Sequence, residues 1–169
     1  MASSLFTRHE SLMDQLLLPT QAANLSAFLT QQNKSVVLVG GCFDIIHPGH
    51  LAFLEKAKKE GDVLILLLES DQAVTSRKGE GRPVNTEQIR AKNLLERTPV
   101  DYIIFLPFPF ENNDYDELVS SLKPAIIATT KGDPYLVHKK RQAEMTGAKV
   151  VEVIDRLPDH STTAIITKQ

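Results

Sequence analysis

Two histidines, His47 and His50, stand three residues apart directly after a glycine turn. Residues at this spacing lie on one face of a helix, so both imidazoles can reach one ligand. Gly40 and Gly41 end an apolar run, and Pro48 suits a first helical position because it has no N–H to lose there. This order of strand, turn and helix N-terminus attracts anions. Imidazoles placed there can stabilise charge on a phosphoryl group without a covalent nucleophile.

Other interpretations of the same residues stay open on the sequence alone. His47 and His50 could be half of a metal site, or they could simply cap the helix. Cys42 could act as a nucleophile, although its place next to the strand end suits a small packing residue. Neither GxxxxGK[ST] nor GxGxxG follows the first strand, which excludes a P-loop and a dinucleotide-binding fingerprint at this turn.

Strands must alternate with helices to position this turn. Apolar runs predict strands at 36–39, 63–68, 101–106, 125–128 and 149–154. Amphipathic patterns and caps predict helices at 20–33, 48–59, 86–97, 114–122, 136–145 and 162–168. The alternation predicts an α/β fold, a single Rossmann-like domain with a parallel five-stranded sheet and helices on both faces. The polar, glycine-bearing segment 70–83 is expected to be a mobile loop at its centre.

The first 33 residues are expected to form an N-terminal helical extension, and residues 34–169 the main domain. Leucines within residues 1–19, including Leu12, Leu16 and Leu17, recur at helical spacing, which favours a docked helix. A tail that orders on a partner subunit is the competing interpretation. A homodimer is therefore left open.

The composition is that of an ordinary globular protein: 169 residues, 42% hydrophobic and 24% charged. A net charge of -2 gives no reason to expect nucleic acid as a partner. No apolar run approaches the roughly 20 residues that span a bilayer. The one cysteine, Cys42, allows no internal disulfide, so a cytoplasmic location is expected.

A resemblance to a known superfamily rests on several segments. GCFDIIHPGH matches the GxFDxxHxGH signature of the cytidylyltransferase-like nucleotidylyltransferases. SRKGEGRPVN, Arg90, VDYIIFLP, KGDPY and STTAII then follow in the order of that superfamily. From Lys34 to the C-terminus the chain most resembles the adenylyltransferase domain of bacterial ADP-heptose synthase. Glycerol-3-phosphate cytidylyltransferase is similar at a greater distance.

The resemblance implies roles for individual residues. His47, His50 and Lys78 would contact the triphosphate and stabilise the transition state. Nucleotide binding is implied at the turn, the helix start and two later segments: Gly41, Cys42, Phe43, Gly49, His50, Lys131, Gly132, Ser161, Thr162 and Thr163. Contacts with the acceptor or with phosphate are implied at Asp44, Arg90, Asp133 and Tyr135.

Two of these roles have a structural alternative, and one segment departs from the pattern. Arg90 could instead form a surface ion pair, and Ser161 could be an ordinary N-cap. Related enzymes have a KGGDY-like segment where this chain has KGDPY, and Pro134 removes an N–H from that loop.

The implied activity is Mg²⁺-dependent transfer of AMP from ATP to a sugar 1-phosphate resembling heptose 1-phosphate, with release of pyrophosphate. Mg²⁺ would be held by phosphate oxygens and water, so no protein residue is assigned as a metal ligand. One alternative is a cytidylyltransferase that uses CTP and glycerol 3-phosphate or a similar alcohol phosphate. Another is a nucleotide-binding regulatory protein without turnover. The acceptor depends on loop shapes, including the PFPF segment 107–110, which could line a pocket or a dimer surface.

Overall fold

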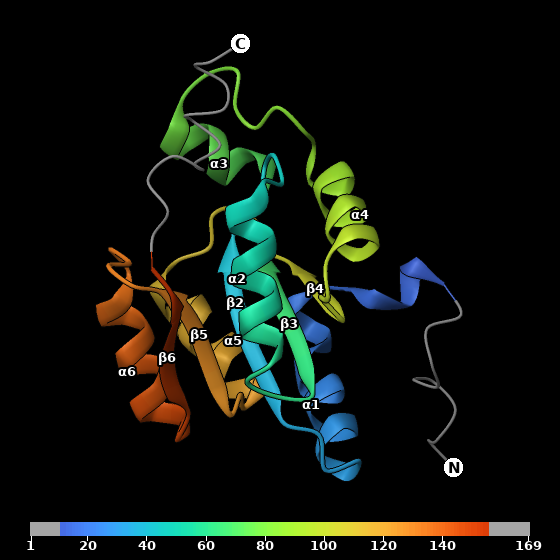
Figure 1. Ribbon diagram of the computed structural model, residues 1–169, viewed down its shortest axis with the longest axis vertical. Helices are drawn as coiled ribbons and strands as arrows, with labels where there is room; N and C mark the ends of the chain where they lie inside the picture. Colours follow the sequence, from blue (N-terminus) through green and yellow to red (C-terminus); the bar gives the residue numbers. More distant parts are fainter. Residues whose placement is uncertain (1–10, 156–169) are drawn as a thin grey trace.

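A parallel sheet with helices on both faces forms the centre of the computed structural model, which describes residues 11–155 (Figure 1). Within these residues the sheet has six strands in the order β1-β4-β3-β2-β5-β6. The strands are β1 (Leu16–Leu17), β2 (Val36–Gly41), β3 (Val63–Leu68), β4 (Tyr102–Phe105), β5 (Ile126–Thr130) and β6 (Lys149–Ile154). The predicted α/β class is confirmed, with one strand more than the five expected.

Helices connect the strands and cover both faces of the sheet. The α-helices are α1 (Ala22–Gln31), α2 (Pro48–Lys58), α3 (Asp71–Lys78), α4 (Glu87–Arg97), α5 (Asn112–Leu122) and α6 (Leu136–Thr146). Two short 3-10 helices, η1 (Leu12–Gln15) and η2 (Pro19–Gln21), flank β1. The predicted helices that begin at residues 20, 48, 86, 114 and 136 each correspond to a helix, with ends displaced by a few residues.

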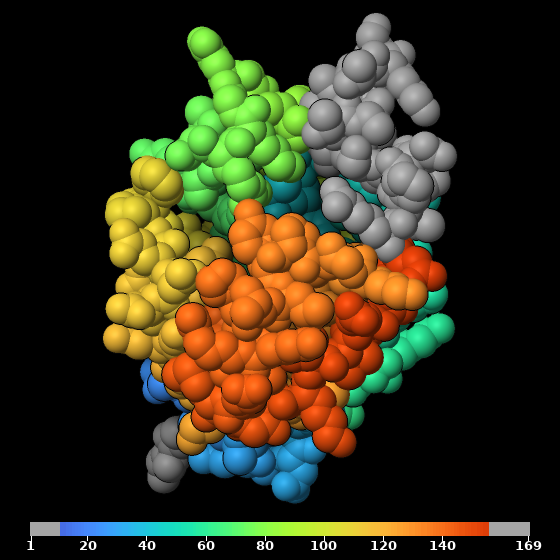
Figure 2. Space-filling model, turned by 90° about the vertical axis from the view of Figure 1, so that its left-hand side faces the viewer, coloured from blue at the N-terminus to red at the C-terminus, as the bar shows by residue number. Residues whose placement is uncertain are grey.

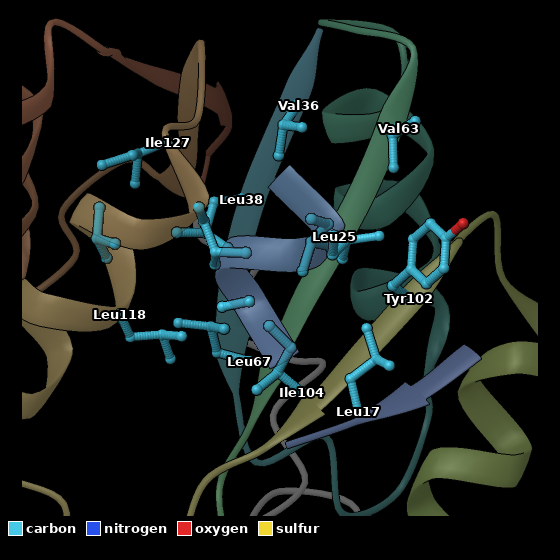
Figure 3. Packing of buried hydrophobic residues seen from close by; sticks show 14 of the residues in the cluster. Leu17, Leu25, Val36, Leu38, Val63, Leu67, Tyr102, Ile104, Leu118 and Ile127 are labelled. Carbon is cyan, nitrogen blue, oxygen red and sulfur yellow. The ribbon is translucent and has the colours of Figure 1, made fainter. Parts of the chain in front are cut away.

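The alternation of side chains along each central strand divides the core into two layers. Val36 and Leu38 of β2 belong to the cluster covered by α1 and α5, which Figure 3 shows. Val37 and Val39 of the same strand belong to the opposite cluster, covered by α2 and α4. Because β2 and β3 are buried on both faces, their sequences are continuous apolar runs, as is usual for parallel strands.

The additional strand lies where a helix was expected. Leu16 and Leu17 pair in parallel with Ile103 and Ile104 of β4 rather than continuing a helix. Pro19 stands at the first position of η2, so helical hydrogen bonding cannot run through this segment. The two leucines extend the sheet beyond β4 instead.

The segment 70–83, predicted to be a mobile loop at its centre, contains the helix α3. The Ser70 hydroxyl accepts a hydrogen bond from the Ala73 N–H at 3.2 Å and caps this helix. The helix ends at Gly79, whose φ of 93° is unfavourable for other residues. The helix was not predicted because its sequence is polar and Val74 is its single buried residue. The division of the chain into an N-terminal extension and a main domain, between residues 33 and 34, stays a prediction.

Candidate active site

A cavity of about 610 Å³ opens at the carboxyl ends of β2 and β5. The chain runs outward from β2 to β3 and β4, and then crosses back to place β5 on the other side of β2. Ligands of open α/β sheets bind at such a reversal of strand order. In Figure 2 a hollow lies between α3 in green and the orange segment that leads into α6, with teal atoms inside it. The size of the cavity suits small-molecule ligands.

The glycine turn after β2 forms one side of the cavity. A Cβ atom on Gly41 would lie 2.9 Å from Cε2 of Phe43, so any other residue there would displace the ring of Phe43. Phe43 has a φ of 44°, a left-handed conformation that is uncommon for an aromatic residue. Strain of this kind is concentrated at functional sites. The turn therefore holds a backbone geometry that its residues would not adopt by themselves.

His47 and His50 meet at the N-terminus of α2. His47 is the N-cap residue, and its Nδ1 accepts a hydrogen bond from the His50 N–H at 3.3 Å. The two rings are stacked with centroids 3.7 Å apart, and Phe43 lies 4.8 Å from the His50 ring. Both histidines line the cavity. The geometry thus brings both imidazoles to the positive end of a helix dipole, as the sequence predicted.

The stacked arrangement disfavours a positive charge on His50. Burial lowers the pKa of His50 to about 3, and the charges of His47 and Lys78 act in the same direction. A hydrogen bond to the Ile45 backbone acts in the opposite direction but is outweighed, so in the absence of ligand the imidazole of His50 is neutral at pH 7. A bound anion would oppose this shift because it favours the protonated ring.

We expect this buried imidazole to make the protein sensitive to mild acid. The unfolded chain protonates His50 near pH 6.5 and the folded chain only near pH 3. The contribution of the neutral His50 ring to the free energy of unfolding is therefore present above pH 6.5 and is lost as the pH falls. Between pH 6.5 and pH 5 the free energy of unfolding should fall by about 2 kcal/mol on account of this residue. Urea denaturation at pH 7 and pH 5 measures it, and His50→Gln should lose less. Equal losses in both proteins would contradict the assignment.

Asp44 anchors a neighbouring loop with its carboxylate. Its Oδ2 accepts hydrogen bonds from Arg82 Nε at 3.0 Å and from the Val84 N–H at 2.9 Å, while its Oδ1 accepts the Asn85 N–H at 2.9 Å. Burial works against ionisation, but these hydrogen bonds outweigh it and lower the pKa of Asp44. Asp44 is 1% exposed and does not line the cavity. Its contacts in the structure hold the loop 82–85 to the turn after β2.

Arg90 is fully buried and connects the ends of two strands. Its Nη1 donates to the Cys42 carbonyl at 2.6 Å, and its Nη2 donates to the Glu69 carbonyl and to Asp71 Oδ1, both at 2.8 Å. Its Nε donates to the Asn85 carbonyl at 3.1 Å. The interpretation of Arg90 as a surface ion pair is wrong, because the side chain is 0% exposed.

Two cations of α3 lie close to the turn and the cavity. Lys78 Nζ is 3.1 Å from Cys42 Sγ, beside the turn after β2. Arg77 lines the cavity and forms a two-bonded ion pair with Glu69, at 2.9 and 2.5 Å. The hydrogen bonds that Arg77 donates to the Glu69 carboxylate raise the pKa of Arg77. The helix that replaces the expected loop thus brings basic groups toward the site.

A second polar cluster follows β5. Asp133 Oδ2 accepts hydrogen bonds from the Thr129 hydroxyl and from Lys139 Nζ, the latter at 2.5 Å. The Tyr135 N–H donates to Asp133 Oδ1 at 2.7 Å, and Lys139 Nζ also lies 2.9 Å from Thr129 Oγ1. Burial opposes the charge, but the hydrogen bonds outweigh it and lower the pKa of Asp133. These side chains line the cavity together with Pro134.

The structure brings many of the predicted residues together and separates others. Eight of them line the cavity: Gly41, Cys42, Phe43, His47, Gly49, His50, Asp133 and Tyr135. Lys131 is exposed, pairs with Asp155 at 3.7 Å and, like Gly132, does not line the cavity. Ser161, Thr162 and Thr163 lie outside the described residues.

Other cavity residues had no signal in the sequence analysis. Lys139 and Gln142 lie on one face of α6, three residues apart, and Tyr115 and Asn112 come from the start of α5. Thr129 and Thr130 end a buried strand, which could have indicated a site at the same sheet edge. Because the segment 70–83 was predicted to be a loop, Arg77 was not predicted to line the cavity.

The described residues hold no cluster of three or more His, Cys, Asp or Glu side chains that could bind a metal ion. Over the same part of the chain, no helix combines the length and apolar character required to cross a membrane.

The parallel sheet, its switch-point cavity and the histidine pair at a helix N-terminus define a Rossmann-like protein of the nucleotidyltransferase type. The model of the cytidylyltransferase-like family matches residues 38–168, and the chain belongs to this family. The predicted enzyme class, a nucleotidyltransferase, is thereby confirmed.

Curated relatives carry the same name in several bacteria. The chain is 42% identical over 147 residues to the bifunctional protein HldE of Campylobacter jejuni subsp. doylei, an alignment that covers 85% of this chain and 30% of that protein. It is 35% identical over 158 residues to the protein of that name from Pseudomonas fluorescens, covering 92% of this chain and 31% of the relative. The chain therefore spans about a third of the length of these relatives.

Solved structures share the fold. A lipopolysaccharide core biosynthesis protein from Thermoplasma volcanium has a TM-score of 0.56 and 26% identity, over 76% of this chain and 99% of that one. A pantoate-beta-alanine ligase from Francisella tularensis has a TM-score of 0.60, over 85% of this chain and 68% of that one. At 15% identity the latter shows the fold alone.

Proposed function

We propose that this chain transfers AMP from ATP to a sugar 1-phosphate resembling heptose 1-phosphate and releases pyrophosphate. The observation that supports it most is the stacked pair His47 and His50 at the N-terminus of α2, facing the switch-point cavity. A helix N-terminus and two ring N–H donors suit a phosphate group that gains charge during transfer.

In the proposed reaction an oxygen of the acceptor phosphate forms a bond to the α-phosphorus of ATP. The bond from that phosphorus to the oxygen bridging the β-phosphate breaks, and pyrophosphate leaves with the electron pair. His50 and the α2 backbone N–H groups would donate to the phosphoryl oxygens, while Lys78 would add positive charge nearby. Ser161, Thr162 and Thr163 would bind the outer phosphates, as the resemblance implies.

The residues present fit a metal that arrives with the nucleotide. Mg²⁺ keeps several waters and binds substrate phosphates through their oxygens, so it requires few protein ligands. When bound, Mg²⁺ would neutralise part of the triphosphate charge.

The choice of a sugar phosphate as acceptor is supported by the relatives. The relatives named HldE, and the similarity to a lipopolysaccharide core biosynthesis protein, favour a sugar acceptor. The description of the family as cytidylyltransferase-like favours the alternative, transfer of CMP from CTP to glycerol 3-phosphate or a similar alcohol phosphate.

Thermal unfolding with each nucleotide separates these two candidates. A ligand that binds only the folded state stabilises it by RT ln(1 + [L]/Kd), which is about 2.7 kcal/mol at a hundredfold excess over Kd. With Mg²⁺ present, we expect ATP to raise the melting temperature by several degrees and CTP to raise it less. Pyrophosphate release with ATP and a sugar 1-phosphate is the confirming assay. A larger shift and turnover with CTP would replace the proposal by its alternative.

A further inference from the structure

The wall of the cavity outside the histidine pair carries two ion pairs that the proposed reaction does not use. Its residues come from the end of β3, from α3, α5 and α6 and from the loop before α6: Glu69, Arg77, Tyr115, Asp133, Lys139 and Gln142. We propose that this wall, named here the acceptor wall, binds the hydroxyl groups of the sugar phosphate. The inference rests on the proposed function and names the part of the site that selects a polyhydroxylated acceptor.

The position of the wall follows from the geometry of in-line transfer. The acceptor contributes a phosphate oxygen to the α-phosphorus, which the proposed function places at the N-terminus of α2 beside His47 and His50. The remainder of the acceptor must then extend away from α2. Residues of α3, α5 and α6 line the same cavity, so the hydroxyl-bearing carbon chain would lie against these helices.

The charges of the acceptor wall suit hydroxyl groups better than a second phosphate. Glu69 pairs with Arg77, and Asp133 pairs with Lys139, so each pair carries no net charge. A hydroxyl group both donates and accepts a hydrogen bond, and a carboxylate beside a cation offers both partners. The side chains of Asp133 and Lys139 are only 10% and 22% exposed, so the pair is partly withdrawn from solvent. Hydrogen bonds to charged groups are correspondingly stronger there.

Hydrogen-bonding capacity remains after the internal contacts are counted. A carboxylate has about four lone-pair positions. Asp133 accepts bonds from Thr129, Lys139 and the Tyr135 N–H. Glu69 accepts its two bonds from Arg77. Both carboxylates therefore keep at least one position for a ligand hydroxyl.

The two ion pairs are held on a rigid frame. The amide of Gln142 donates to Asp116 Oδ1 at 3.2 Å, and Arg141 binds the same carboxylate at 2.8 and 2.9 Å, which fixes α6 against α5. The ring of Tyr115 packs edge-on against Phe110 at 4.8 Å. Burial raises the pKa of Tyr115 to about 12, so its hydroxyl keeps its proton at neutral pH and remains a donor.

The test is equilibrium binding of the sugar phosphate together with steady-state kinetics. The sugar 1-phosphate is titrated calorimetrically into the full chain with Mg²⁺ and a non-hydrolysable ATP analogue, and KM is measured for each substrate. The variant is Lys139→Met, and Glu69→Gln is the second variant, which keeps the shape of the side chain. Lys140→Met is the matched control, because Lys140 is the next residue of α6, is exposed and does not line the cavity.

We expect Lys139→Met and Glu69→Gln to weaken acceptor binding and raise its KM on the order of 10- to 100-fold. The KM for ATP should change less than threefold, and Lys140→Met should match the wild type. A shift in the KM for ATP instead of the acceptor would overturn the inference and assign the wall to the nucleoside. Unchanged acceptor binding in both variants would also overturn it.

The same measurements separate this inference from the proposed function. Binding of the sugar phosphate that depends on Lys139, without release of pyrophosphate, would support the acceptor wall and contradict the transferase proposal. Turnover that is insensitive to both substitutions would support the transferase proposal and contradict the acceptor wall. If the wild-type chain binds no sugar phosphate, both are wrong.

Discussion

His50→Ala should lower the turnover number of pyrophosphate release on the order of 10²–10³-fold, the usual cost of removing one preorganised donor to a developing charge. The imidazole is neutral in the free protein and lies at the N-terminus of α2, so its N–H can strengthen its hydrogen bond as charge develops. An interaction made mainly in the transition state changes kcat more than KM. We therefore expect the KM for ATP to change less than tenfold in initial-rate assays.

Two further measurements make this result specific. His50→Gln keeps an N–H donor on a flexible side chain and should retain part of the turnover, so its rate should lie between those of wild type and His50→Ala. The melting temperature of each variant shows whether the fold persists, since loss of the ring that stacks on His47 removes packing. Turnover near the wild-type value with every acceptor tested would contradict the role of His50.

The unit from β2 to α2 could be predicted in detail because all of its signals are local. The apolar run ends at Gly40 and Gly41, and Pro48 starts the helix within a few residues. The histidines follow from that geometry, since an N-cap residue and the residue three positions later must meet at one helix end. Local sequence was sufficient where the site itself is built from one continuous segment.

Elements that depend on distant partners could not be predicted. β1 has two residues, and only the free edge of β4 makes Leu16 and Leu17 a strand. α3 has a polar sequence, so its hydrophobic pattern was too weak to distinguish it from a loop. For β1, the signal that decides the structure comes from a part of the sheet that is remote in sequence.

The same distinction holds for the site residues. Lys139 reaches the cavity because α6 packs beside β5, and nothing in its own segment indicates this. Arg90 is on an amphipathic helix, where an arginine usually faces solvent, yet its partners are carbonyl groups of Cys42 and Glu69. A motif locates a residue in the chain, but its hydrogen-bond partners come from the packing of the sheet edge.

Arg90→Met should destabilise the protein by about 3–5 kcal/mol, because several buried carbonyl groups would lose their donor at a cost of about 1–3 kcal/mol each. The guanidinium donates to the carbonyls of Cys42 and Glu69 at the ends of β2 and β3, and to Asp71 at the start of α3. Methionine fills much of the space and leaves all four acceptors, including the Asn85 carbonyl, without that donor. For a chain of this size the melting temperature should fall on the order of 10 °C.

A control on the same helix separates the loss of these contacts from the loss of charge. Arg97 is two turns further along α4 and is exposed, so Arg97→Met should change stability by less than about 0.5 kcal/mol. Arg90→Lys keeps the charge but loses the forked donor geometry, and its stability should lie between wild type and Arg90→Met. If Arg90→Met were as stable as Arg97→Met, the four hydrogen bonds of Arg90 would contribute little, and the ends of β2 and β3 would be held together by apolar packing alone.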